Sequence, residues 1–211
     1  MAVAAPGRDC PLCPRLVAFR EEWRAKEPGW HNAPVPSFGD HSARLLIVGL
    51  APGLRGANRT GRPFTGDYAG DLLYRTMLEY GFATGTYAAR PDDGLTLVDA
   101  MIANAVRCVP PENKPTPAEI NTCRPFLVAD IAAMPNLTAI MVLGRIAHDS
   151  TVKTLGLARS GAPFAHGAIH VVRPGVTLHD SYHCSRYNTN TGVLTEAMFR
   201  AVFAGIRKRL G

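Results

Sequence analysis

The chain has 211 residues, of which 46% are hydrophobic, so it can bury an ordinary core without help from disulfides. Its 23 Lys and Arg residues against 17 Asp and Glu give a formal net charge of +6, which favours a polyanionic partner, although solubility alone would also account for it. No apolar run is long enough to span a membrane, and the length suits a single domain over residues 1–211.

The N-terminal segment carries two cysteines before its first predicted helix, at residues 14–27. Cys10 and Cys13 have a spacing that turns both thiols toward one point, and Cys108 with Cys123 would complete a four-thiol site. The first residues lack the composition of a signal peptide, so we expect a cytoplasmic location, where thiols stay reduced. This favours a metal or cluster site over free core cysteines. The spacing does not separate zinc from an iron–sulfur cluster.

A predicted strand and a glycine-rich loop come next. Residues 44–49 form a short apolar run ending in glycine, typical of a buried parallel strand. Residues 50–69 are too rich in glycine and proline for a regular element, and a helical pattern resumes at 71–80. In this loop Phe64 can stack on a flat ligand, and Asp67 can accept a proton or orient a water. The alternatives are a loop anchor for Phe64 and a helix N-cap for Asp67.

The middle of the chain contains a second predicted strand, residues 98–106, which Asn104 interrupts. A buried Asn needs partners, and its amide can match the edge of a nucleobase, although a satisfied core Asn is the alternative. A proline-rich loop at 110–117 then leads into a capping-box sequence, which opens a helix predicted to continue through Ile131.

The C-terminal third adds a buried strand, a helix, a strand or hairpin and an amphipathic last helix, predicted at 139–144, 146–155, 169–178 and 196–210. Before the last helix, residues 179–192 form a polar segment that predicts a functional loop. In it His183 can act as an acid or as a neutral donor to a developing anion. Other side chains of this loop can hold phosphates, or merely close a turn and cap the last helix: Ser185, Arg186, Asn188 and Asn190.

Strands that alternate with helices and end in glycine predict a three-layer α/β/α domain with a mainly parallel sheet. Ligands of such sheets bind at the carboxyl edge of the strands, where the loops described above would meet. Arginines in or beside these loops are candidates for phosphate contacts, among them Arg55, Arg59, Arg62, Arg107 and Arg186.

Three motifs together resemble the iron–sulfur uracil-DNA glycosylases of family 5, also called type b. They are Gly-Leu-Ala-Pro-Gly at 49–53 with Asn-Arg-Thr-Gly-Arg-Pro-Phe-Thr-Gly-Asp at 58–67, Asn-Ala-Val-Arg-Cys-Val-Pro-Pro at 104–111, and Ser-Tyr-His-Cys-Ser-Arg-Tyr-Asn at 181–188. The similarity runs over nearly the whole chain and includes the four cysteines. It implies a uracil-DNA glycosylase fold and a [4Fe-4S] cluster on Cys10, Cys13, Cys108 and Cys123.

The resemblance also implies an activity and a set of site residues. The enzyme would hydrolyse the N-glycosidic bond of uracil, and of other deaminated bases such as hypoxanthine, in double-stranded DNA and leave an abasic site. The flipped base would stack on Phe64, be recognised by Asn104 and receive a hydrogen bond from His183, in a pocket that also includes Ala51 and Asn58. Ser185, Arg186, Asn188 and Asn190 would contact the DNA of a monomeric enzyme.

Two departures leave roles open. Related families place an acidic or amide side chain just after Gly49 to orient the attacking water, but Leu50 and Ala51 are apolar here. Asp67 is then the first candidate for that role and Asn58 the second. Cys184 follows His183 where the family more often has proline. Two other functions are a non-catalytic iron–sulfur module that binds damaged DNA and a zinc-stabilised nucleotide hydrolase.

Overall fold

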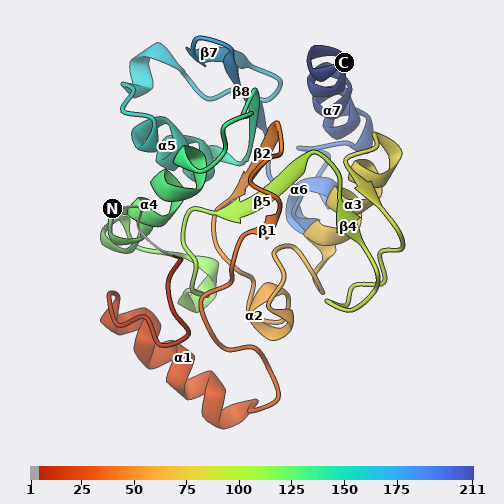
Figure 1. Ribbon diagram of the computed structural model, residues 1–211. Helices are drawn as coiled ribbons and strands as arrows, with labels where there is room; N and C mark the ends of the chain where they lie inside the picture. Colours follow the sequence, from red (N-terminus) through yellow and green to blue (C-terminus); the bar gives the residue numbers. More distant parts are fainter. Residues whose placement is uncertain (1–4) are drawn as a thin grey trace.

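The computed structural model describes residues 5–211, which are built around a six-stranded sheet (Figure 1). The strand order is β1 (Phe38–Gly39), β5 (Ala100–Asn104), β2 (Leu45–Gly49), β6 (Ala139–Leu143), β8 (Val176–Ser181) and β7 (Ile169–Arg173). The inner four strands run parallel, and each edge strand pairs antiparallel with its neighbour. A separate two-stranded ribbon pairs β3 (Ala83–Thr84) with β4 (Thr96–Leu97).

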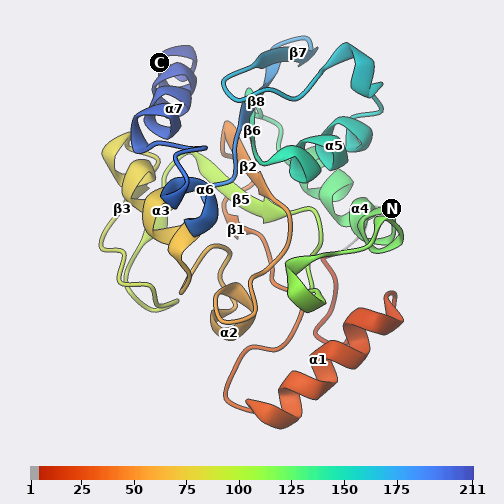
Figure 2. The ribbon, with the colours of Figure 1, turned by 180° about the vertical axis from the view of Figure 1, so that it is seen from behind.

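Helices cover both faces of the sheet (Figures 1 and 2). Side chains of β2 alternate between two cores: Leu45 and Ile47 join the core under one pair of helices, and Leu46 and Val48 join the other. Helices α3 (Tyr68–Glu79) and α7 (Glu196–Leu210) cover the first face, and α4 (Pro117–Ala132) and α5 (Arg145–Thr154) cover the second. The predicted three-layer architecture is confirmed.

The remaining helices are shorter or lie outside the two layers. Helix α1 (Pro14–Lys26) packs Leu16 against Val106 in the segment that follows β5. Helices α2 (Ala57–Thr60) and α6 (Arg186–Asn190) each form about one turn, and 3-10 turns occupy Pro111–Asn113 and Arg159–Gly161. Within residues 5–211, none of the helices combines the length and the apolar character that crossing a membrane requires.

Local capping explains where the main helices begin. The predicted capping box is present at α4, where Thr116 accepts from the Glu119 N–H and the Glu119 carboxylate accepts from the Thr116 N–H. Helix α3 begins three residues before the predicted 71–80, because the Asp67 side chain accepts a hydrogen bond from the Gly70 N–H and caps the helix.

The predicted long loop at 179–192 is wrong in extent. Strand β8 continues through Ser181, and α6 occupies much of the rest. The polar residues of β8 misled the prediction because they are satisfied inside the fold. Asp180 lies 2.7 Å from the Nδ1 of His148, and His179 contacts Thr177 at 3.0 Å. The irregular part of this segment is therefore confined to residues 182–185 and to the turn at 191–192.

The parallel strands end together and bring distant loops to one edge. The Ala105 N–H donates to the Gly49 carbonyl at 2.9 Å, which joins the segments after β5 and β2. The Gly144 N–H donates to the Ser181 carbonyl at 2.8 Å, which joins the segments after β6 and β8. This edge carries the cavity described next.

Candidate active site

A cavity of about 640 Å³ opens at the carboxyl edge of the sheet. Its volume lies in the range typical of small-molecule sites. The lining includes seven residues predicted from the sequence: Ala51, Phe64, Asp67, Asn104, His183, Ser185 and Arg186. The structure thus gathers residues from four separate segments of the chain.

Asn104 is the last residue of β5 and is only 2% exposed. Neither the oxygen nor the nitrogen of its amide has a hydrogen-bond partner among the described residues. Leaving a buried polar group unpaired costs about 1–3 kcal/mol, so this amide is arranged for a partner that enters the cavity. Gly49 permits the arrangement, because a Cβ there would lie 2.4 Å from Asn104 Oδ1 and 2.6 Å from Phe64 Cζ.

Phe64 forms a second wall of the cavity. Its φ of +52° places it in the left-handed region, which is unusual for a bulky residue. Its carbonyl oxygen lies so close to Gly70 that a Cβ at Gly70 would be 1.7 Å away. The Phe64 ring centroid is 6.1 Å from that of His183, with 32° between the planes.

His183 lies in the turn between β8 and α6. Burial lowers the pKa of its imidazole to about 4, so the ring is neutral at pH 7. Its carbonyl accepts a hydrogen bond from the Asn188 side chain at 2.8 Å, which fixes the turn. A neutral imidazole offers one N–H donor, and this one is held beside Asn104 and Phe64 in the lining of the cavity.

The lowered pKa of His183 predicts a pH dependence. Between about 4 and the unfolded value of about 6.5, the unfolded chain binds more protons than the folded one. The contribution of His183 to stability is therefore complete above pH 6.5 and is lost as the pH falls toward 4. We expect His183→Gln to reduce the slope of the unfolding free energy against pH in this window, measured by urea denaturation. His179, whose pKa burial also lowers to about 4, should retain a residual slope.

The half-exposed His41, replaced by Gln, serves as the control for replacing a histidine that lies outside the cavity. Activity of the wild type should show no inflection near pH 6.5. An inflection there that disappears in His183→Gln would mean that the ring titrates normally and would contradict the neutral assignment.

Asp67 fits both of its predicted interpretations. Its Oδ1 accepts from the Gly70 N–H at 3.2 Å and caps α3, while its carboxylate also lines the cavity. The other oxygen faces the glycine-rich turn, where a Cβ at Gly56 would lie 2.4 Å from Oδ2. Burial and the nearby Asp71 raise the pKa of this carboxyl group above its usual value. Asn58, the second candidate, does not line the cavity, because its buried amide donates to Asn32 at 2.8 Å.

The predicted DNA contacts divide by position. Ser185 caps α6 at the cavity mouth, and Arg186 lies over the Tyr68 ring, 5.3 Å from its centroid. Asn188 holds the His183 turn, and Asn190 is exposed at the end of α6. Arg55 also lines the cavity.

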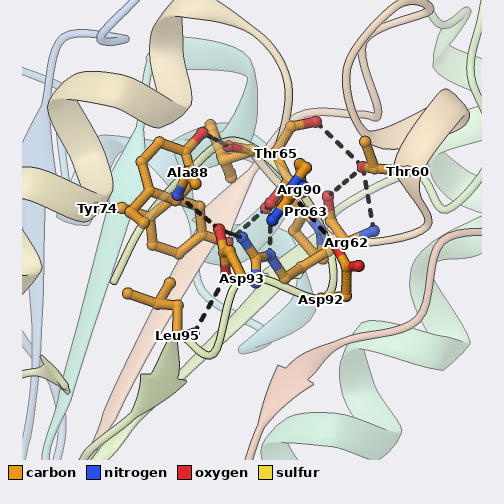
Figure 3. A network of polar contacts seen from close by, with 12 residues as sticks. Thr60, Arg62, Pro63, Thr65, Tyr74, Ala88, Arg90, Asp92, Asp93 and Leu95 are labelled. Carbon is orange, nitrogen blue, oxygen red and sulfur yellow. Dashed lines mark hydrogen bonds and ion pairs between the residues drawn. The ribbon is translucent and has the colours of Figure 1, made fainter. Parts of the chain in front are cut away.

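Two of the arginines suggested as phosphate contacts are instead buried inside the protein. Arg62 pairs with Asp93, and Arg107 pairs with Asp130 and Ser37. The sequence prediction is wrong for both, because a loop position does not reveal an internal carboxylate partner. The Asp93 pair was not foreseen from the sequence, and it belongs to a network that includes Pro63 and Thr65, the two neighbours of Phe64 in the chain (Figure 3).

A second, largely apolar cavity is lined by Cys10, Cys13, Cys108 and Cys123. The structure thus brings the two distant cysteine pairs together, as predicted. Burial raises the pKa of the Cys108 thiol to about 12 and that of Cys123 to about 11. The Arg107 N–H donates to Cys123 Sγ at 3.3 Å, and the buried Arg20 also borders the cavity. Within residues 5–211 no three His, Cys, Asp or Glu side chains are gathered closely enough to hold a metal ion as they stand. Cys184 is separate and buried, with its thiol near the Ala69 carbonyl.

Comparison with known proteins places this arrangement in a family. The model of the Uracil DNA glycosylase superfamily matches residues 36–207. The type-5 uracil-DNA glycosylase of Thermus thermophilus is 44% identical, over 96% of this chain and 94% of that protein. The type-5 enzyme of Mycobacterium leprae is 41% identical, over 96% of this chain and 92% of that protein. The type-4 uracil-DNA glycosylase of Archaeoglobus fulgidus is 36% identical over 54% of this chain and 49% of that protein. The chain therefore belongs to the type-5 group of the uracil-DNA glycosylase superfamily.

Proposed function

We propose that the protein is a DNA repair enzyme that hydrolyses the N-glycosidic bond of uracil in duplex DNA and leaves an abasic site. The observation that carries this proposal is the unpaired, buried amide of Asn104 beside the ring of Phe64. An amide edge and an aromatic face suit a flat, polar base, and the Asn104 amide has no other partner among the described residues. The similarity to type-5 uracil-DNA glycosylases supports the same conclusion.

The proposed reaction begins when the target base leaves the helical stack and enters the cavity. The base stacks on Phe64, and the Asn104 amide donates to one base oxygen and accepts from the neighbouring N–H. As the bond from the base to the sugar breaks, its electron pair moves onto the base. The neutral His183 donates a hydrogen bond to the oxygen on which this negative charge develops.

Water then adds to the anomeric carbon of the sugar, and Asp67 is proposed to orient it. Its carboxylate lines the cavity, and Gly56 makes room for it, because a Cβ there would lie 2.4 Å from Oδ2. The raised pKa makes this carboxyl group a better proton acceptor than an ordinary aspartate. Asn58 does not compete for this role, since its amide is bonded to Asn32.

The cavity also suggests a broader range of bases. Leu50 and Ala51 supply an apolar wall where a polar side chain would impose a stricter hydrogen-bonding requirement. We therefore propose that hypoxanthine and other deaminated bases are accepted as well as uracil. Around the mouth, Ser185, Arg186, Asn188 and Asn190 are proposed to contact the DNA strand of a monomeric, cytoplasmic enzyme.

The second cavity is proposed to hold a [4Fe-4S] cluster on Cys10, Cys13, Cys108 and Cys123. Two observations support this proposal: four thiols, the ligands that such a cluster takes, border one apolar space, and Arg20 adds a buried positive charge beside thiols that must deprotonate to bind metal. Ala51 packs against the apolar group that contains Cys123, and it also lines the active-site cavity. The two cavities therefore share a wall. We propose that the cluster is structural, because hydrolysis of a glycosidic bond transfers no electrons.

Purified protein should show broad absorbance near 400 nm and about four irons per chain. Cys108→Ala should lose most of this absorbance, lower the melting temperature and lose activity in parallel. Cys184→Ala is the matched control, since its thiol lies outside the cysteine cavity, and it should retain the iron. Zinc without iron would overturn the cluster. Loss of activity in Cys108→Ala with an unchanged melting temperature would contradict a structural role.

The glycosylase proposal is tested on duplex oligonucleotides that contain uracil opposite guanine. Incubation followed by alkali should cleave the strand at the uracil position. Tight binding without cleavage would instead indicate a damage-binding module. Hydrolysis of free nucleotides without action on the duplex would indicate a nucleotide hydrolase.

A further inference from the structure

The loop between β3 and β4 packs against the segment that carries Phe64 (Figure 3). From this loop, the Asp93 carboxylate accepts hydrogen bonds from both terminal nitrogens of Arg62, each at 2.8 Å. It also accepts from the backbone N–H groups of Ala88 and Leu95, at 2.8 and 3.1 Å. The side chains of Arg62 and Asp93 are 6% and 1% exposed, so the pair is inside the protein. Asp93 therefore fixes both its own loop and Arg62.

Arg62 passes this constraint to its neighbours. Its Nε donates to Thr65 Oγ1 at 2.7 Å, so the side chain links the two residues that flank Pro63 and Phe64 in the chain. Aromatic rings surround its guanidinium carbon, at 5.4 Å from the centroids of Phe38 and Tyr74 and 5.8 Å from that of Tyr87. Such contacts leave the guanidinium few alternative positions.

Two of these aromatic residues also hold the backbone at Phe64. The Tyr74 hydroxyl donates to the Pro63 carbonyl at 2.6 Å, and the Tyr87 hydroxyl donates to the Phe64 carbonyl at 3.3 Å. The two tyrosine rings pack on one another with centroids 4.7 Å apart. Phe64 itself has the left-handed φ of +52°, a conformation that persists in a bulky residue only where its surroundings enforce it.

We propose that Asp93 is a positioning residue for the glycosylase reaction. Through Arg62, Tyr74 and Tyr87 it holds Phe64 in the left-handed conformation that presents the ring to the flipped base. Asp93 does not line the cavity, so its effect on the base passes through Phe64. The inference rests on the proposed function, because it assigns a role within the same site.

Asp93→Asn tests the inference, with Asp99→Asn as the matched control. Asp99 also pairs with an arginine, Arg44, and also accepts a backbone N–H. It differs in position, because it lies beside the first residue of β2, whereas the cavity lies at the carboxyl end of that strand. We expect Asp93→Asn to lower single-turnover kcat/KM on uracil-containing duplex about 10- to 100-fold, and Asp99→Asn to change it less than about threefold. Melting temperatures define an assay temperature at which every variant is folded.

The decisive comparison is a double-mutant cycle with Phe64→Ala. If Asp93 acts through the Phe64 ring, adding Asp93→Asn to Phe64→Ala should lower kcat/KM by less than about a further twofold. An equal loss in both backgrounds, or an equal loss in Asp99→Asn, would overturn the proposal. If Asp93→Asn does not fold, Tyr87→Phe takes its place, since it removes only the hydroxyl that holds the Phe64 carbonyl. The smaller loss of kcat/KM expected for Tyr87→Phe should likewise disappear in the Phe64→Ala background.

Hydrogen exchange of the amides at 62–66 separates this proposal from the function on which it rests. Asp93→Asn should accelerate exchange there, while Asp99→Asn should not. Failure of the wild type to release uracil would refute the proposed function, and unchanged exchange in Asp93→Asn would refute the positioning role.

Discussion

Replacing His183 by alanine is expected to lower the single-turnover rate on uracil-containing duplex about 100- to 1,000-fold. The neutral imidazole donates to the base oxygen on which negative charge develops, and loss of one such donor typically costs about 3–4 kcal/mol of transition-state stabilisation. The effect should fall mainly on the rate of the chemical step, because the charge is absent from the bound substrate.

Two variants control this experiment. His183→Gln retains a side-chain N–H donor and should recover part of the rate. His41→Ala removes a half-exposed imidazole that does not line the cavity and should retain full activity. A wild-type rate in His183→Ala would remove this residue from the reaction.

Replacing Asn104 by leucine is expected to change activity and stability in opposite directions. Leucine has nearly the shape of asparagine but no polar atoms to leave unpaired in the empty cavity. Removing this buried amide, which has no hydrogen-bond partner, should therefore raise the free energy of unfolding by about 1–3 kcal/mol. The same change removes recognition of the base edge and should lower kcat/KM at least about 100-fold.

Asn58→Leu provides the matched control. Asn58 is also buried, but its amide is already bonded to Asn32, and leucine would leave the Asn32 oxygen without that partner. This variant should be destabilised where Asn104→Leu is stabilised, in parallel urea titrations. A loss of stability in both would show that the Asn104 amide has a structural partner and would refute its assignment as a ligand-binding group.

The sequence predicted those parts of the fold that depend on local chemistry. The apolar runs of β2 and β6, the capping box at Thr116 and the apolar face of α7 each have a signal within a few residues, and each element formed where it was expected. Strand β1 has only two residues and was missed, because so short an edge strand is defined by its partner β5.

Contacts between residues far apart in the chain could not be predicted from the sequence. Asp180 lies in a buried strand because His148 on α5 pairs with it, and nothing near Asp180 in the chain indicates this. Arg62 was likewise predicted to contact phosphate, because nothing near it in the chain indicates its partner Asp93, 31 residues away. The cavity was better anticipated because its residues follow strands, and parallel strands bring such positions to one edge.

A structure of the protein with duplex DNA that contains a non-cleavable deoxyuridine analogue tests the central claim most directly. The uracil should lie outside the helical stack, with its face on Phe64, and within about 2.7–3.2 Å of the Asn104 amide and the His183 ring. A uracil that remains stacked in the duplex, or that binds elsewhere while the Asn104 amide stays unpaired, would contradict the account.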